Sequence, residues 1–128
     1  MQTIPTEAEE QTALFQWADV MKAQYPELAL LHHIPNGGSR NKIEAARLRA
    51  QGVKPGVPDI FLPVPRGGYH GMYIELKRRD KRLSRISNEQ KIWLTALGGQ
   101  GYKCLVCFGA DEAITEITKY LRLKRKGN

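Results

Sequence analysis

The sequence is poor in cysteine: its 128 residues include two, Cys104 and Cys107. They form one C-x-x-C within a strand-like segment, where an offset of three residues sends the side chains to opposite faces. A redox C-x-x-C opens a helix instead. A zinc site needs further ligands at suitable spacing, which the three histidines do not provide. We therefore expect two buried free thiols rather than a disulfide or a metal site.

Long hydrophobic runs are also missing. No apolar run approaches the roughly 20 residues that a transmembrane helix requires. The N-terminus lacks the basic region and apolar core of a signal peptide. The chain contains no internal repeat, low-complexity segment or interdomain linker. We therefore expect a soluble, intracellular (cytoplasmic) protein without membrane association, in which residues 1–128 form a single domain around one core.

The charge balance is strongly basic. Lys and Arg number 20 against 13 Asp and Glu, which leaves a net charge of +7. An excess of this size favours a polyanionic partner, either nucleic acid or an anionic membrane surface. No Ser-His-Asp or Cys-His arrangement points to covalent catalysis.

The most informative segment is 56–77. It reads as two short strands joined by a turn at Gly67-Gly68, with Asp59 at the start of the first strand and Glu75 and Lys77 on the second. Because side chains alternate along a strand, Glu75 and Lys77 share one face, and Met72, Ile74 and Leu76 take the other. Two acids and one lysine therefore converge.

Converging buried carboxylates need a common partner, because an unpaired ion in the interior costs several kcal/mol. Carboxylate oxygens suit Mg²⁺ or Mn²⁺, which also bind phosphate oxygens. A lysine beside them can hold or activate an attacking water. The pattern thus predicts phosphodiester hydrolysis. The alternative is a structural ion pair between Glu75 and Lys77, with Asp59 capping a turn after Pro58.

The segments Gly56-Val57-Pro58-Asp59 and Glu75-Leu76-Lys77 together resemble the PD-(D/E)xK nuclease motif, and more closely its small VRR-NUC subfamily. Residues 7–11, 34–38 and 87–90 also resemble this family. The resemblance implies the α/β fold of a single-domain PD-(D/E)xK, restriction-endonuclease-like core, in which helices flank a mixed sheet. It also implies a metal-dependent DNA endonuclease.

A first helix is predicted from Thr6, as N-cap, to near Tyr25. Glu7 and Glu10 both project onto its apolar stripe, and periodicity cannot choose between them. The family spacing of Glu, three residues and Gln matches Glu7 with Gln11. The resemblance therefore brings Glu7 to the metal, whereas the alternative is an ordinary first-turn acid.

Segment 28–34 reads as a short strand, followed by a turn at 35–40 that is either a DNA-contacting loop or a plain connector. Asn41 then caps a helix that stops at Gly52. Basic residues surround this helix and follow the second strand of the motif. As DNA-binding residues we predict Asn36, Arg40, Lys42, Arg47, Arg49, Lys54, Arg78 and Arg79.

Ser87 to Gln90 form a capping box that opens a helix ending at Gly98-Gly99. The family resemblance instead puts Gln90 near the catalytic lysine, and we treat the two roles as alternatives. The run 102–108 predicts a buried strand, parallel to the Glu75 strand because a helix connects them. A last helix begins at Ala110 or Asp111.

Together these features predict a Mg²⁺- or Mn²⁺-dependent DNA endonuclease. The expected catalytic residues are Asp59, Glu75, Lys77, Glu7 and Gln90, and the expected metal ligands are Asp59, Glu75 and the Leu76 carbonyl. Likeness to small junction resolvases predicts a homodimer that prefers branched DNA, in particular four-way (Holliday) junctions. The alternatives are a non-catalytic nucleic-acid-binding module and an interaction domain for an acidic partner protein.

Overall fold

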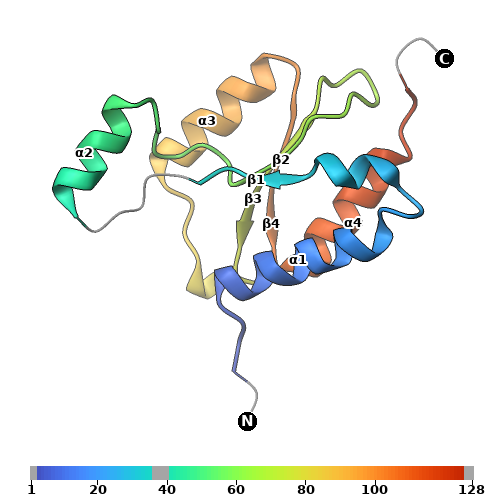
Figure 1. The fold of residues 1–128 in the computed structure, drawn as a ribbon, viewed down its shortest axis with the longest axis horizontal. Coiled ribbons are helices and arrows are strands. Elements are labelled where there is room, and N and C mark those ends of the chain that lie inside the picture. The colour runs from blue at the N-terminus through green and yellow to red at the C-terminus, as the bar shows by residue number, and fades with distance from the viewer. Residues whose placement is uncertain (1–2, 36–40, 126–128) are drawn as a thin grey trace.

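The computed structural model describes residues 3–35 and 41–125. Its helices and strands are, in order, α1 (Glu7–Met21), the 3-10 helix η1 (Pro26–Leu30), β1 (His32–His33), α2 (Lys42–Ala50), β2 (Ile60–Leu62), β3 (Met72–Lys77), the 3-10 helix η2 (Lys81–Leu83), α3 (Asn88–Gly99), β4 (Lys103–Phe108) and α4 (Ala110–Leu121) (Figure 1). The strands form one sheet in the order β1-β2-β3-β4. The first two pairs are antiparallel and the third is parallel. The expected α/β fold with a mixed, helix-flanked sheet is confirmed.

The predicted hairpin is formed by β2 and β3. Gly67 and Gly68, at its turn, have φ angles of 58° and 85°, which glycine adopts without strain. Ile60 pairs with Ile74, so the register sets Asp59 opposite Glu75 at the site end of the hairpin. β4 lies parallel to β3, as its helical connection requires.

The hydrophobic core lies between the sheet and the packed pair α1 and α4. It contains Leu14 and Ala18 of α1, Ile74 and Leu76 of β3, and Ile117 and Tyr120 of α4. The Tyr120 hydroxyl donates a hydrogen bond to the Val64 carbonyl at 2.6 Å, which ties α4 to the segment after β2. Because Ile74 and Leu76 are packed in this core, it holds the end of β3 that carries Glu75 and Lys77 in place.

Two segments differ from the predictions. α1 ends at Met21, before the expected end near Tyr25, because the amides of Gln24 and Tyr25 turn back to the Met21 carbonyl. Segment 28–34 is mostly η1, and only two residues form β1. Its buried residues, Leu28 and Leu31, are three apart, which is the period of a 3-10 helix.

β4 is only partly buried, contrary to the expectation of a buried strand, because it lies at the edge of the sheet. Cys107 is buried, and this burial raises the pKa of its thiol to about 12. Cys104 is half-buried, so the expectation of two buried thiols is wrong for it.

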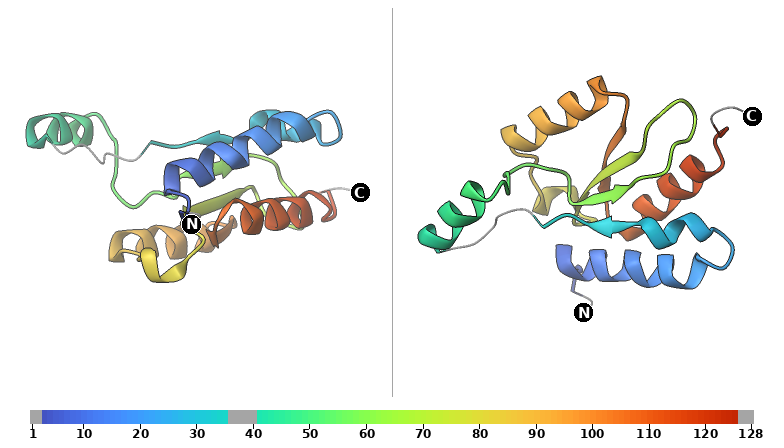
Figure 2. Two further views of the ribbon diagram at one scale, coloured as in Figure 1. Left: turned by 90° about the horizontal axis from the view of Figure 1, so that it is seen from below. Right: turned by 45° about the horizontal axis from the view of Figure 1, so that its top comes forward.

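Asn41 caps α2 as predicted, accepting hydrogen bonds from the amides of Ile43 and Glu44. The helix lies away from the sheet and from the other helices (Figure 2). It contains no buried residue, and Ile43 is 74% exposed. Within 3–35 and 41–125, no helix is long and apolar enough to cross a membrane.

Candidate metal centre

Three carboxylates from three elements meet at one end of the hairpin. Glu7 begins α1, Asp59 precedes β2 and Glu75 lies in β3, and one oxygen of each lies within 4.8 Å of the others. Asp59 and Glu75 are buried, with 6% and 2% of their surfaces exposed, whereas Glu7 is exposed. They line a cavity of about 340 Å³ together with Gln11, His33 and Gln90.

Two buried carboxylate oxygens in this cluster lack a hydrogen-bond partner: Asp59 Oδ1 and Glu75 Oε1. The other oxygen of each is engaged, because Asp59 Oδ2 accepts from the Leu76 amide at 3.2 Å and Glu75 Oε2 accepts from Gln90 Nε2 at 3.0 Å. Leaving a buried acceptor unpaired is costly. Two free oxygens with a third carboxylate beside them fit a hard divalent cation such as Mg²⁺ or Mn²⁺.

The electrostatics of the cluster also favour a cation. Burial raises the pKa of Glu75 to about 9, and the neighbouring Asp59 carboxylate adds to the shift. Burial likewise raises the pKa of Glu7, with Asp59 adding to the effect and Lys77 opposing it. Three close carboxylates repel one another, and a divalent ion relieves this repulsion.

Lys77 is buried beside the acids. Its Nζ lies 3.7 Å from Glu75 Oε2, so the ion pair of the alternative interpretation is present. Asp59 does not cap a turn after Pro58, however, because its bonded oxygen contacts the neighbouring strand. An ion pair with Lys77 leaves the free oxygens of both acids unexplained.

Gln90 closes the capping box and also lies beside Lys77, two positions that the sequence alone presents as alternatives. Its Oε1 accepts from the Ser87 amide at 2.8 Å, which closes the capping box, and from Lys77 Nζ at 3.2 Å. Its Nε2 donates to Glu75. The assumption that one glutamine serves only one role is wrong, because a carbonyl oxygen has two lone pairs and the amide nitrogen is a separate donor.

A glycine brings the motif segment against α3. Gly56 has a φ of 91°, and a Cβ atom there would lie 2.7 Å from the backbone carbon of Glu89. Only glycine fits this conformation and this approach. The close contact places the segment leading to Asp59 directly against the first turn of α3, where Gln90 lies.

The two candidate acids of α1, Glu7 and Glu10, have different surroundings. Glu7 joins the carboxylate cluster, whereas Glu10 is buried against Arg79 and the start of α4. Helical geometry alone does not decide which of them lies at the candidate metal site, and the structure places Glu7 there. The matching of Glu7 with the family spacing agrees with its place in the cluster.

The predicted DNA-binding residues are not gathered in one place. Asn36 and Arg40 lie outside the described residues. Lys42, Arg47 and Arg49 are exposed on α2, and Lys54 is exposed just beyond it. Arg78 and Arg79 extend from the end of β3 to contact α1 and the residues before it. The amide of Leu76 contacts Asp59, and the metal role of its carbonyl stays a prediction.

Sequence reasoning assigned no role to His33 or Gln11, which line the same cavity. His33 Nδ1 lies 2.9 Å from the Asp59 carbonyl oxygen, because β1 pairs with β2 beside the motif. The signal for Gln11 was its family spacing from Glu7. The sequence points to His33 only through its position just before the 34–38 segment. Its contact with Asp59 depends on the pairing of β1 with β2, which the sequence does not reveal.

A mixed sheet that presents two buried acids and a lysine at one end, with a helix acid beside them, defines a nuclease-like core of the PD-(D/E)xK class. The family model of the VRR-NUC domain matches residues 2–111, and the chain belongs to this family. A solved structure described as a VRR_NUC domain protein has a TM-score of 0.80 and 32% identity, with 96% of this chain and 93% of that chain covered. No curated protein matches the chain. The family indicates a nuclease.

Proposed function

We propose that the protein is a Mg²⁺- or Mn²⁺-dependent DNA endonuclease. The pair of unpartnered buried oxygens, Asp59 Oδ1 and Glu75 Oε1, carries this proposal, because a stable core offers no reason to bury them. They lie on the same hairpin as Lys77, whose buried ammonium lies 3.7 Å from Glu75 Oε2.

In this proposal Asp59, Glu75 and the Leu76 carbonyl hold the metal, and Glu7 holds the metal or its water. When bound, the metal supplies Lewis acidity to the phosphate and lowers the pKa of a bound water. Lys77 orients the attacking water and stabilises the negative charge that develops on the phosphate.

Gln90 acts through Lys77 and Glu75. Its amide oxygen faces Lys77 Nζ and its amide nitrogen faces Glu75 Oε2, so it fixes the separation of the ammonium and the carboxylate. Because the amide is itself held by the α3 cap, it restricts the rotamers of Lys77. Such support keeps the reacting groups in a productive geometry.

DNA is the polyanion that we propose as the partner. The exposed cations Lys42, Arg47 and Arg49 of α2, with Lys54 after it, can follow a phosphate backbone, and Asn36 and Arg40 precede them in the chain. Their helix has no buried face, so its side chains are accessible to a ligand.

We further propose that the substrate is branched DNA, in particular a four-way junction, and that the enzyme is a homodimer. A junction presents two strands related by a two-fold axis. The described residues contain one carboxylate cluster, so two symmetric incisions call for two copies of the chain. A non-catalytic DNA-binding module explains the basic charge equally well but not the buried acids.

The test is cleavage of supercoiled plasmid, linear duplex, flap and four-way junction DNA with Mg²⁺ or Mn²⁺. We expect cleavage with either ion, none with EDTA, and none by Asp59→Asn. A matched control is Asp19→Asn, which removes an exposed acid of α1 and should cleave normally. Binding of DNA without any metal-dependent cleavage would favour the non-catalytic module instead.

A further inference from the structure

We propose that Arg78, Arg79 and Glu10 form a clamp that holds Glu7 in the carboxylate cluster, so that both arginines are positioning residues rather than DNA contacts. The inference rests on the proposed function, because it assigns the clamp to the metal site. It departs from the sequence-based prediction, which placed both arginines on DNA.

The first half of the clamp is the pair formed by Arg79 and Glu10. Arg79 Nε donates to Glu10 Oε2 at 2.7 Å and its Nη2 donates to Oε1 at 2.9 Å, a bidentate arrangement. Glu10 is 1% exposed, and its Oε1 also accepts from the Ala110 amide at 3.1 Å. One carboxylate therefore joins α1, the segment after β3 and the start of α4.

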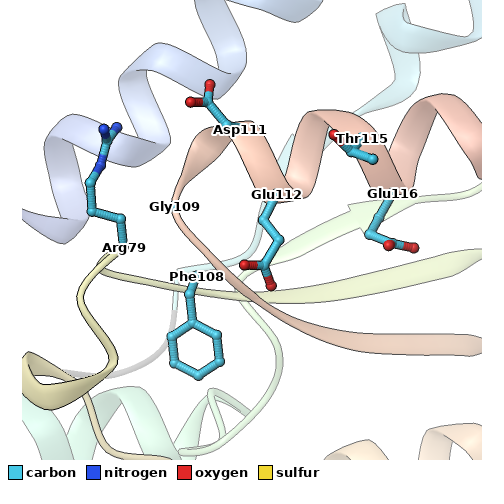
Figure 3. A pocket seen from close by; sticks show the side chains of 7 residues that line it. All are labelled: Arg79, Phe108, Gly109, Asp111, Glu112, Thr115 and Glu116. Carbon is cyan, nitrogen blue, oxygen red and sulfur yellow. The ribbon is translucent and has the colours of Figure 1, made fainter.

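Gly109 shows how closely these elements approach. It has a φ of 94°, and a Cβ atom there would lie 3.0 Å from Arg79 Cβ and 3.5 Å from Glu10 Oε2. Its amide donates to the Lys77 carbonyl at 2.8 Å. Figure 3 shows Arg79 pointing toward the ribbon of α1, with Gly109 at the adjacent turn.

Arg78 provides the second half. Its Nε donates to the Pro5 carbonyl at 2.9 Å and its Nη2 to the Ile4 carbonyl at 2.8 Å. These carbonyls lie two and three residues before Glu7, and Glu10 lies three residues after it. Consecutive arginines thus hold the chain on both sides of Glu7, immediately beyond Lys77.

Glu7 needs such support because it is the first residue of α1 and is exposed. Helix ends fray, and a frayed first turn would withdraw this carboxylate from the cluster. The Thr6 and Glu9 capping box orders the turn itself. The hydrogen bonds of Arg78 and Arg79 join that turn to the segment that directly follows Glu75 and Lys77.

The surroundings of Arg79 are unfavourable for a phosphate. Its side chain is half-exposed, but it borders a cavity of about 370 Å³ whose lining includes Asp111, Glu112 and Glu116 (Figure 3). These carboxylates repel a second anion, and two guanidinium nitrogens already serve Glu10. Arg79 therefore contributes little to a DNA-binding surface.

Three measurements on Arg79→Gln and Glu10→Gln test the clamp. The first is Mn²⁺ affinity by calorimetry, the second is hydrogen exchange of the first-turn amides of α1, and the third is the salt dependence of duplex DNA binding in EDTA. We expect Mn²⁺ binding to weaken about 10- to 100-fold, as for loss of other residues that orient metal ligands. Hydrogen exchange in the first turn should accelerate. The slope of log DNA affinity against log salt concentration (the salt slope) should stay unchanged.

Two control variants match the charge changes. Arg49→Gln removes an exposed arginine of α2 and should lower the salt slope by about 1 while sparing Mn²⁺ binding and exchange. Asp19→Asn removes an exposed acid from the other end of α1 and should leave all three measurements unchanged. Arg79→Lys keeps the charge but loses the bidentate contact, so it should behave as Arg79→Gln even if the latter folds poorly.

A reduced salt slope in Arg79→Gln, with normal Mn²⁺ affinity and normal exchange, would overturn the clamp and restore Arg79 to the DNA surface. Unchanged exchange in both Glu10→Gln and Arg79→Lys would overturn it as well. If the unaltered protein binds no Mn²⁺, the proposed function fails, but exchange in the first turn still decides whether the clamp exists.

Discussion

Gln90 Oε1 accepts hydrogen bonds from Lys77 Nζ at 3.2 Å and from the Ser87 amide at 2.8 Å. One oxygen thus completes a helix cap and holds the buried lysine of the candidate site. The α3 helix and the metal centre are consequently coupled: the residue that starts the helix also sets the position of the ammonium group.

Substitutions of Gln90 should separate its two roles. Glu is as suitable as Gln at this capping position, so Gln90→Glu should keep the cap but replace the amide that donates to Glu75 with another carboxylate, which repels Glu75. We expect reduced turnover and a melting temperature that falls at neutral pH and recovers in acid, where the added carboxylate is protonated. Gln90→Ala should lose both the cap contact and the contact with Lys77, with a destabilisation of about 1 kcal/mol that does not recover in acid. Thermal unfolding at neutral and acid pH and cleavage rates measured on both variants check this. A loss of stability in Gln90→Glu that persists in acid would contradict the dual role.

The site acids should oppose stability in the metal-free protein. Asp59 Oδ1 is buried without a partner and lies in a cluster of like charges. Asp59→Asn relieves this repulsion, and its amide can donate to Glu75. We expect it to abolish cleavage, weaken Mn²⁺ binding and stabilise the metal-free fold by about 1 kcal/mol. Lys77→Ala should abolish cleavage with metal binding largely intact. Calorimetry of Mn²⁺ binding and urea unfolding in EDTA distinguish the Asp59→Asn variant from the Lys77→Ala variant. Full activity in Asp59→Asn would contradict the assignment of the site.

The sequence was sufficient for the hairpin and the faces of β3, because a turn at two glycines and strict alternation leave few other arrangements. It could not decide between Glu7 and Glu10, since both lie on one face of α1 and only tertiary contacts separate them. It also missed the contacts of Arg78 and Arg79. Charged side chains after a strand look solvated in sequence, and their partners lie about 70 residues earlier in the chain.

The Arg79 contact should appear in the acid stability of the protein. The hydrogen bonds from Arg79 hold the pKa of Glu10 below its ordinary value of 4.5. A lowered folded-state pKa adds stability above the unfolded value, and this contribution is lost as pH falls through the folded pKa. Glu10→Gln should therefore lower the free energy of unfolding by about 2 kcal/mol at pH 7. The difference from the unaltered protein should shrink below about pH 4.5.

Urea unfolding from neutral to acid pH measures this difference, with Asp19→Asn as the control. Asp19 forms only an exposed pair with Lys22, so its replacement should change stability little at any pH. A Glu10→Gln penalty that persists unchanged at acid pH would show that packing, rather than ionisation, is responsible.

The cations of α2 should dominate the electrostatics of DNA binding. Lys42, Arg47 and Arg49 are exposed on a helix without a buried face. Replacing all three by Gln should lower the slope of log affinity against log salt by about 3, since each phosphate contact contributes about 0.9. Mn²⁺ affinity should not change. Fluorescence anisotropy over a range of salt concentrations checks this, and an unaltered slope would move the DNA surface elsewhere.

The last prediction concerns assembly. If the enzyme acts on four-way junctions, two symmetric strands must be cut, and the described residues supply one carboxylate cluster per chain. A homodimer with an isologous interface would hold two such clusters about the two-fold axis of the junction. Light scattering should then give twice the chain mass, and incision mapping should show paired cuts at symmetric positions.

A mixed dimer sharpens this test. Combining one unaltered chain with one Asp59→Asn chain should leave each active subunit able to nick one strand, so nicked junctions should accumulate and paired incisions should fall. A monomer at working concentration that nicks linear duplex as readily as the junction would contradict both the dimer and the junction preference. It would leave the metal-dependent chemistry standing, because Asp59, Glu75 and Lys77 all lie within one chain.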